Sequence, residues 1–393
     1  MLKHGRCFKG DQGHEKNWAH LLLGTLIMGA PSAYAQSGPS DTAEKSSSSI
    51  STSFFQGQDP FKEWLAGQGG DLALVYTNDA MSSNTSGGNR RGGVDMGFFE
   101  AQLAFDLEKL AGLNGWSFYA NVFQLHSTGR FRRNYVGAQN TVAWTEAKPT
   151  TRLSELWLEY KFTDNVNLRF GQLAADTEFA TSEVSTLFLQ SDWSTIMAGA
   201  MPNGGPAAPL STPGARLQID PTKDTSLLLA VFNGDPAGRG AGEEQGRNPH
   251  GLNFRVNDPP LFMAEGQYRL NQDESDGGLA STFKFGAWHH QDDFADQRYG
   301  TDGRSLADSA SNGTGRPHQG NFGFYSVVDQ QLYRPAGVGP DGGISIFNRI
   351  SVSPSDRNAI DFFVDGGIVF AGLIAARPDD KFGASVIYSR YSS

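Results

Sequence analysis

Three polar residues alternate with leucines in one short segment of the chain. Glu155, Trp157 and Glu159 lie two positions apart, so on an extended strand they would share one face. Two carboxylates could suggest a glycosidase acid/base pair. Glu155 and Glu159 would, however, lie about 13 Å apart at ~3.3 Å per residue, beyond the separations that retaining or inverting hydrolysis uses. The pattern therefore favours a polar lining over an active site.

Further charged and amide side chains fall on the same kind of face by the parity of their own segments. Such groups can hydrogen-bond a solute weakly enough to release it again. Opposed Arg and Glu rows across a narrow channel would also disfavour ions of either sign. The alternative is a solvated lining far from any narrow point. The expected set is Glu100, Gln102, Glu155, Trp157, Glu159, Arg169, Arg216, Glu265 and Gln267, with Arg169 and Arg216 foremost because they flank the longest loop.

The pair His289-His290, followed by Asp292 and Asp293, could suggest a metal site. Adjacent strand residues face opposite ways, so the two histidines cannot chelate together. We find no Ser/His/Asp, P-loop or dinucleotide-binding pattern in a fitting context. The sequence therefore predicts no catalytic residue, no metal site and no cofactor, and the protein is not expected to be an enzyme.

The elements that must position the polar face are strands. From Asp71 onward, stretches alternate apolar with polar or small residues and end at Gly, Pro, Asn or Asp, which is the strand signature. In Leu153–Phe162, for example, Leu156 and Leu158 would face lipid. We expect thirteen strands, near 71–80, 94–107, 115–127, 153–162, 166–173, 214–221, 225–233, 260–270, 282–290, 321–332, 343–353, 359–373 and 381–391.

The segments between these strands alternate long and short up to a long one at 291–320. An up-and-down outer-membrane barrel gives that rhythm, with tight periplasmic turns and larger outer loops, whereas a Greek-key sandwich has no reason for it. The fold class expected is thus an all-β, transmembrane antiparallel barrel. We expect the longest loop, 174–213, to fold inward and set the bore, the alternative being an external loop. Its candidate constriction residues are Glu178, Phe179, Phe188 and Trp193.

Composition and charge exclude other classes of protein. The 393 residues include Gly 48 and Phe 27 but Cys 1, which gives many turns and aromatic anchors and no disulfide framework. A formal net charge of −10 argues against nucleic acid as a partner, because phosphate binding needs a basic face. No later stretch is apolar enough for a spanning helix, so in a membrane the chain would have to form a closed barrel.

The N-terminus reads as an export signal. A basic stretch precedes the apolar segment Leu21–Ala30, and Ala33-Tyr34-Ala35 forms a cleavage site, as in secretory signal peptides. The apolar run is about half of the ~20 residues that a spanning helix needs. We expect a signal peptide over 1–35, a flexible leader and short periplasmic segment over 36–70, and the barrel over 71–393.

Several segments, in their order along the chain, resemble the carbohydrate-selective outer-membrane porins of the OprB type, over roughly residues 55–393. The resemblance implies a sixteen-stranded monomeric barrel, surrounded by outer-membrane lipid, through which glucose and related small neutral carbohydrates diffuse passively. It also implies inward-folded loops and a lining of charged and aromatic side chains. The matching segments are Asp71–Phe105, Asp106–Leu113, Arg152–Tyr160 with Leu168–Gln172, and Val327–Phe347.

The chain departs from this family in its odd number of strands, since single-chain bacterial barrels carry an even number. We expect a barrel that is incomplete at its C-terminus, with three strands missing. Strands 71–80 and 381–391 would then lie apart or meet in strained geometry. Two other functions stay open, namely a general small-solute porin and a secreted or periplasmic β-sandwich that binds carbohydrate as a lectin does.

Overall fold

The structure is a computed structural model that describes residues 22–23, 60–83, 90–131, 134–135, 145–189, 195–273, 275–339, 341–374 and 376–392. The expected signal peptide and leader therefore lie mostly outside the described residues, as does Trp193. Among the described residues, no helix combines the length and the hydropathy needed to cross a membrane.

Antiparallel strands dominate the described chain and join into one sheet whose order follows the sequence. Thirteen long strands run from β2 to β14, and the two-residue β1 (Leu22–Leu23) pairs with β14. The expected all-β, up-and-down architecture is confirmed. The long strands are β2 (Gly70–Ser83), β3 (Gly92–Asp106), β4 (Trp116–Ser127), β5 (Thr150–Thr163), β6 (Val166–Leu173), β7 (Thr212–Thr222), β8 (Thr225–Asn233), β9 (Pro260–Leu270), β10 (Ser281–Gly300), β11 (Gly315–Tyr333), β12 (Gly343–Val352), β13 (Ile360–Ala371) and β14 (Lys381–Tyr391).

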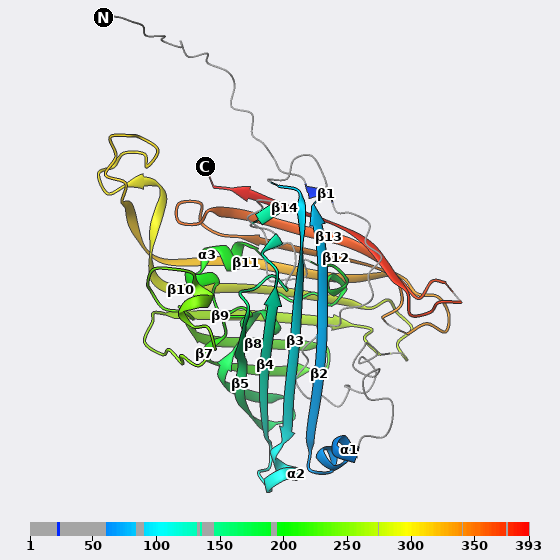
Figure 1. The fold of residues 1–393 in the computed structure, drawn as a ribbon. Coiled ribbons are helices and arrows are strands. Elements are labelled where there is room, and N and C mark those ends of the chain that lie inside the picture. Colours follow the sequence, from blue (N-terminus) through cyan, green and yellow to red (C-terminus); the bar gives the residue numbers. More distant parts are fainter. Residues whose placement is uncertain are drawn as a thin grey trace, which may run out of the picture.

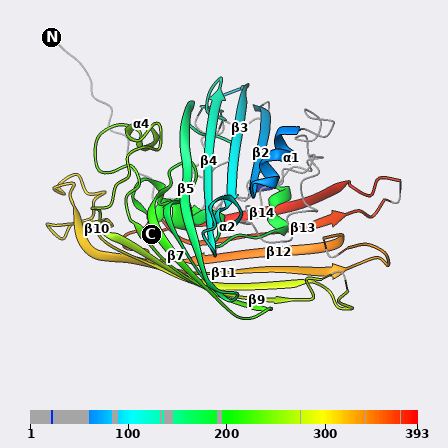
Figure 2. The same ribbon diagram turned by 90° about the horizontal axis from the view of Figure 1, so that it is seen from below.

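The sheet curves strongly, so that β2–β5 rise at a steep angle to the strands from β7 to β13 (Figures 1 and 2). Strands β2 and β14 stand at opposite ends of the thirteen, and within the described residues no hydrogen-bonded pair joins them. The segment between β6 and β7 lies inside the curve (Figure 2). We call the side that this segment covers the inner face.

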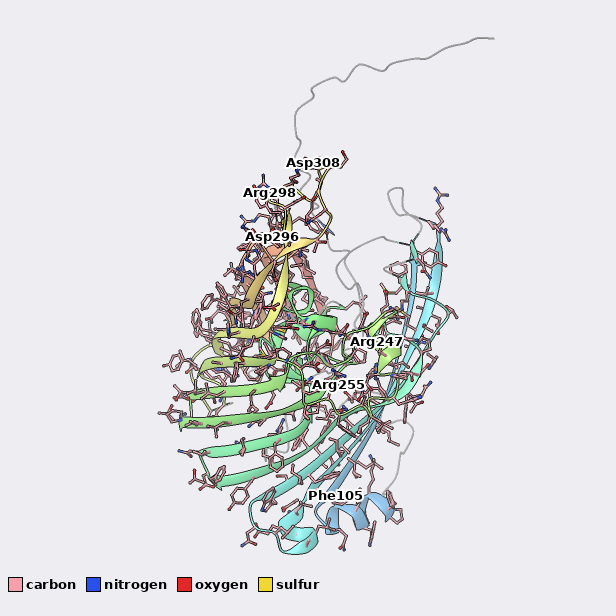
Figure 3. All side chains as sticks on the ribbon, turned by 90° about the vertical axis from the view of Figure 1, so that its left-hand side faces the viewer. Phe105, Arg247, Arg255, Asp296, Arg298 and Asp308 are labelled. Carbon is pink, nitrogen blue, oxygen red and sulfur yellow. The ribbon has the colours of Figure 1, made fainter. Side chains whose placement is uncertain are left out.

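The expected strand positions agree with the structure within a few residues, except at β10 and β11. The stretch expected as the long loop 291–320 instead extends both strands, with pairs such as Phe294↔His318 and Gly300↔Gly315 beyond a bulge at His290/Asp293. Figure 3 shows this extension, with Arg298 and Asp308 at one end of the molecule and Phe105 at the other. Both faces of the extension are largely polar, so it lacks the apolar alternation by which strands are recognised.

A β-bulge in β5 changes which residues face inward. Leu153 pairs with Val122 and Glu155 pairs with Asn121, which leaves Ser154 as the extra residue. Both Ser154 and Glu155 are consequently buried. The bulge is covered by the loop after β8, whose His250 carbonyl accepts the Leu153 N–H at 3.0 Å. A bulge of this kind re-aims side chains at the point where the inner face carries its polar residues.

Two helices flank the short-turn end of the first strands (Figure 1). Helix α1 (Pro60–Gly67) packs Leu65 onto β2, and α2 (Leu107–Ala111) starts at the cap Asp106, whose side chain accepts from Glu108 N and Lys109 N. The α2 cap satisfies two backbone donors that a helix start leaves free. The other helical segments are η3 (Ala175–Thr177), η4 (Val184–Leu187), α3 (Thr195–Ala200), η5 (Pro202–Gly204) and α4 (Glu244–Arg247).

Candidate functional site

The segment 174–211, which we call the strap, connects β6 to β7, and its described residues, 174–189 and 195–211, cover the inner face. It contains η3, η4, α3 and η5. Phe179 and Met197 of the strap are fully buried in the main hydrophobic cluster, together with wall residues such as Leu261 and Trp288. Further along, η4 contacts β12, β13 and β14. The core of the molecule is thus the contact between strap and wall, and the expectation of an inward fold for this loop matches the geometry.

Four charged residues meet where the strap crosses β5, β6 and β7. Glu159, Arg169 and Arg216 are register partners on the three strands, and Glu178 follows η3 on the strap. Arg169 Nε donates to Glu159 Oε2 at 3.0 Å, and its Nη1 lies 3.3 Å from Glu178 Oε1. Arg216 Nε donates to Glu178 Oε2 at 3.1 Å, and its Nη2 donates to Glu159 Oε2 at 3.1 Å. We call these four residues the charge cluster.

Burial makes the charge cluster interdependent. The Arg216 side chain is 1% exposed, whereas Glu159 and Glu178 retain 17% and 16%. A buried guanidinium needs partners for its N–H groups, and Asn167 Oδ1 on β6 supplies another acceptor for Arg216. The two carboxylates and two guanidiniums sum to zero charge. Their oxygen and nitrogen atoms are hydrogen-bond acceptors and donors in a group whose charges cancel in sum.

An aromatic stack lies beside the charge cluster. The Arg169 guanidinium sits 3.8 Å from the centroid of the Trp157 ring, and Trp157 stacks on Tyr119 of β4 with centroids 4.9 Å apart. Both faces of Trp157 are therefore occupied. Within the described chain, Trp157 Nε1 is a buried donor with no hydrogen-bond partner. Such donors are rare in folded proteins and call for water or a ligand.

The remaining lining candidates divide between β3 and β9. Glu100 of β3 accepts from Asn121 Nδ2 at 2.7 Å, and Gln102 is half-buried opposite Asn121 in the register. Glu265 of β9 instead lies under the strap and accepts from Gln267 Nε2 at 2.7 Å. The set expected from parity is thus spread over the inner face, and only part of it meets the charge cluster.

The aromatic residues of the strap serve packing. Phe179 meets Phe232 edge-on at 6.3 Å, and Phe188 packs against Phe347 at 5.6 Å, both between ring centroids. These rings hold the strap against β8 and β12. That Phe179 and Phe188 line a constriction stays a prediction.

Sequence reasoning did not single out Tyr119, Asn167, Lys284, Tyr325 and Asp329, all of which contact the charge cluster's neighbourhood or the strap. For Asp329 the alternation was weak, because Val328 on one side is apolar but Gln330 on the other side is polar. For Tyr325 and Lys284, the alternation along the strand predicts only that the side chain faces inward. It does not show which inward side chains contact the strap or its anchors.

A second loop, 234–259 between β8 and β9, also turns inward, and Figure 3 shows its Arg247 and Arg255 midway between the two arms of the sheet. Arg247 donates to Asn203 of the strap and to the Gly238 carbonyl. Gln172 of β6 donates to the Gly251 carbonyl at 3.0 Å. The two loops therefore support each other at the end of the sheet from which both depart.

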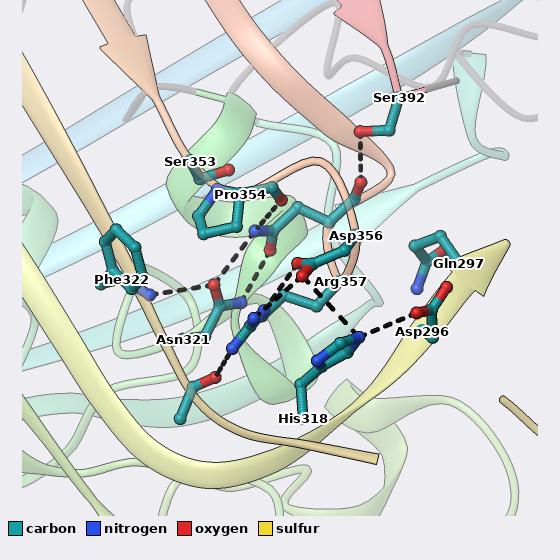
Figure 4. Close-up of polar contacts among 12 residues, drawn as sticks. Asp296, Gln297, His318, Asn321, Phe322, Ser353, Pro354, Asp356, Arg357 and Ser392 are labelled. Atoms are coloured by element: carbon teal, nitrogen blue, oxygen red, sulfur yellow. Dashed lines mark hydrogen bonds and ion pairs between the residues drawn. The ribbon is translucent and has the colours of Figure 1, made fainter. Parts of the chain in front are cut away.

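The extension of β10 and β11 is tied to the turn 353–359 between β12 and β13 (Figure 4). His318 Nε2 lies 2.9 Å from Asp296 Oδ2 and 3.8 Å from Asp356 Oδ2. Arg357 donates to Asp356 at 2.8 Å and to the Gly320 carbonyl at 2.7 Å. The hydrogen bond from Arg357 lowers the pKa of Asp356. We call these residues the outer latch.

The histidine pair has separate surroundings. His290 is buried, with Nε2 2.9 Å from the Gly234 carbonyl oxygen and Nδ1 accepting from Asp292 N at 3.1 Å. His289 is exposed on the opposite face. In the described ranges, no group of three or more His, Cys, Asp or Glu side chains is arranged to hold a metal ion.

Comparison with known proteins agrees with this architecture. A sequence model of the carbohydrate-selective porin, OprB family, matches residues 90–393. Porin B of Pseudomonas aeruginosa is 24% identical over 358 residues, which cover 83% of this chain and 74% of that protein. The high-pH structure of Pseudomonas putida OprB superposes with a TM-score of 0.73 at 17% identity, over 85% of this chain and 78% of that one. Because the family match spans most of the described strands, the chain belongs to the OprB family of carbohydrate-selective porins.

Proposed function

We propose that this porin lets small neutral carbohydrates such as glucose diffuse passively past the charge cluster. The observation that carries the proposal is the meeting of two carboxylates and two guanidiniums where the strap crosses the wall. Carboxylate oxygens accept from sugar hydroxyls and guanidinium N–H groups donate to them. Because each charged group already has a partner, a sugar would displace only part of the network and leave again.

The family implies a channel rather than an enzyme, and porins of this family are outer-membrane proteins. We place the chain there as a monomer exported by the signal over 1–35. The outer side of β6–β11 supports a lipid contact, because it carries an apolar groove of about 720 Å³. Its lining includes Leu168, Leu217, Leu229, Phe262 and Phe324.

The aromatic stack beside the charge cluster would help to orient a solute. Trp157 Nε1 lacks a partner among the described residues, and because it is buried it would donate to a solute hydroxyl only where neighbouring side chains move aside. Because Arg169 and Tyr119 cover the faces of the Trp157 ring, a solute would meet the edge of the ring and not its face. Sugar recognition at this point would therefore depend on hydrogen bonds more than on stacking.

The test is solute flux through the full chain reconstituted in lipid vesicles. We expect glucose to enter faster than gluconate or glucosamine, which are of similar size and carry opposite charges. Glu159→Gln should favour the anion and Arg169→Gln the cation, because each leaves one uncompensated charge. Asp361→Asn serves as a matched control, since Asp361 pairs with Arg390 away from the charge cluster. Equal rates for all three solutes would support the general porin, and a protein that binds sugar but does not conduct would support the lectin-like alternative.

A further inference from the structure

Three carboxylates of the inner wall point at the backbone of the strap. Glu155 of β5 accepts from Ala174 N at 3.2 Å, and Glu265 of β9 accepts from Ala180 N at 2.7 Å. Asp329 of β11 accepts from Glu183 N at 2.9 Å. The three donors follow one another along the strap, while the three acceptors come from strands spread across the sheet. All three carboxylates are buried.

Both carboxylate oxygens of Glu265 already accept hydrogen bonds from the protein. Its Oε2 accepts from Ala180 N and from the Tyr325 hydroxyl, each at 2.7 Å, and its Oε1 accepts from Gln267. The side chain is 1% exposed. Ala180 itself has a φ of 56°, a left-handed conformation that a residue with a β-carbon seldom adopts and that surrounding contacts must hold. Glu265 thus supplies one of the contacts that hold the strap in a strained conformation.

Asp329 holds the next turn of the strap through both of its oxygens. Oδ1 accepts from Ser182 Oγ at 2.5 Å, and Oδ2 accepts from Glu183 N. Ser182 Oγ in turn accepts from Ser185 N at 3.1 Å, so the bond from Asp329 also braces the start of η4. On the strand between the two acceptors, Lys284 Nζ donates to Thr181 Oγ1 at 2.7 Å. Strap residues 180–185 are therefore tied to β9, β10 and β11.

We propose that Glu265 and Asp329, with Glu155, are positioning residues that fix the strap against the wall and do not contact the solute. The inference rests on the proposed function, because the strap also carries Glu178 of the charge cluster. With residues 180–185 tied down, Glu178 is held opposite Arg169 and Arg216. Loss of an anchor would let Glu178 move and would make the bore fluctuate.

The experiment compares strap mobility and conduction in the full chain. Asp329→Ala removes both acceptors, and Ser182→Ala removes the bond to Asp329 together with the bond from Ser185 N, without altering the wall. Hydrogen exchange of a peptide covering 178–189 should become about tenfold faster in Asp329→Ala and increase less in Ser182→Ala. Asp329→Asn, which keeps one acceptor oxygen, should restore slow exchange in part. Asp361→Asn, which removes a carboxylate from β13, should leave this peptide unchanged.

Single-channel recordings give the second readout, because a merely structural role would lower the number of channels without altering each one. We expect Asp329→Ala to raise open-channel current noise and to weaken the preference for neutral sugar. If Asp329→Ala does not fold, Ser182→Ala carries the comparison. Unchanged exchange and noise in the folded variants would overturn the positioning role. Absence of sugar flux in the wild type would overturn the proposed function instead, since exchange reports on the strap without any solute.

Discussion

The charge cluster inside the sheet and the outer latch are built from the same residue types in opposite surroundings. Arg216 in the charge cluster has a side chain 1% exposed. At the outer latch Arg316 is 56% exposed and Asp356 42%, although Asp296, the partner of Arg316, is buried. Inside, every partner comes from a different strand or from the strap, whereas Asp356 and Arg357 are neighbours in sequence. The comparison indicates that solvent access, and not the number of ion pairs, decides how much each network contributes to the free energy of unfolding.

The physical reason is desolvation. A buried charge is tolerated only while its hydrogen-bond and ion-pair partners remain. Removing one residue of the charge cluster therefore leaves the other charges buried without a full set of partners. An exposed pair loses little, because water replaces the missing partner and salt screens the remainder. The following substitutions test this contrast.

The largest effect is expected from Arg216→Met. It leaves Glu159 and Glu178 to share one guanidinium, that of Arg169, and loss of one partner from a buried ion pair costs about 3–5 kcal/mol. Guanidinium-induced unfolding in detergent micelles measures the change. Arg316→Met at the outer latch is the matched control and should cost at most about 1 kcal/mol, because Arg316 is exposed and the buried Asp296 keeps the N–H groups of Arg298 and Tyr299 as donors. Equal losses for the two variants would remove the distinction between the networks.

A glycine on β10 should show the next effect. Tyr325 of β11 lies over Gly286 to reach Glu265, and a β-carbon at Gly286 would meet the Tyr325 Cζ at 2.0 Å. Gly286→Ala should therefore displace the ring and cost about 1–3 kcal/mol, as overpacking does. On the next strand, Gly266 has nothing within 4 Å of its β-carbon position. Gly266→Ala should not destabilise the protein, and a loss as large as that of Gly286→Ala would show that the contact is not the cause.

A smaller change of opposite sign is expected at Ala180. Its φ of 56° is left-handed, so Ala180→Gly relieves strain in the strap and should raise the free energy of unfolding by up to about 1 kcal/mol. Ala264→Gly in β9 serves as the control and should lower it by roughly 0.5–1 kcal/mol. A destabilising Ala180→Gly would mean that the strap does not hold this conformation in solution.

The strands could be predicted because the wall has an apolar and a polar side, which imprints a period of two on the sequence. The same period places Glu159, Arg169 and Arg216 on the inner face. The alternation does not predict the strand residues 291–300 and 315–320, where both sides of the strand are polar.

The two-residue alternation does not predict the path of the strap. Glu178 was expected at a constriction, but its meeting with Arg169 and Arg216 depends on where a forty-residue connection folds back. The role of Gly286 depends likewise on the register of β10 against β11. A local pattern carries no information about either contact, because both join residues far apart in the chain.

The smallest effect is expected from Asp356→Asn in the outer latch. Because the Arg357 hydrogen bond lowers the pKa of Asp356, the carboxylate stabilises the fold above its unfolded pKa of about 3.9 and loses that contribution as the pH falls further. At pH 7 the free energy of unfolding should be about 0.2–1 kcal/mol lower in the variant. The loss is small because the Asp356 side chain is partly exposed. At pH 3 or below, the gap between wild type and variant should narrow, since both side chains become neutral. Unfolding free energies at the two pH values measure this, and an equal loss at both would assign the effect to the shape of the turn and not to its charge.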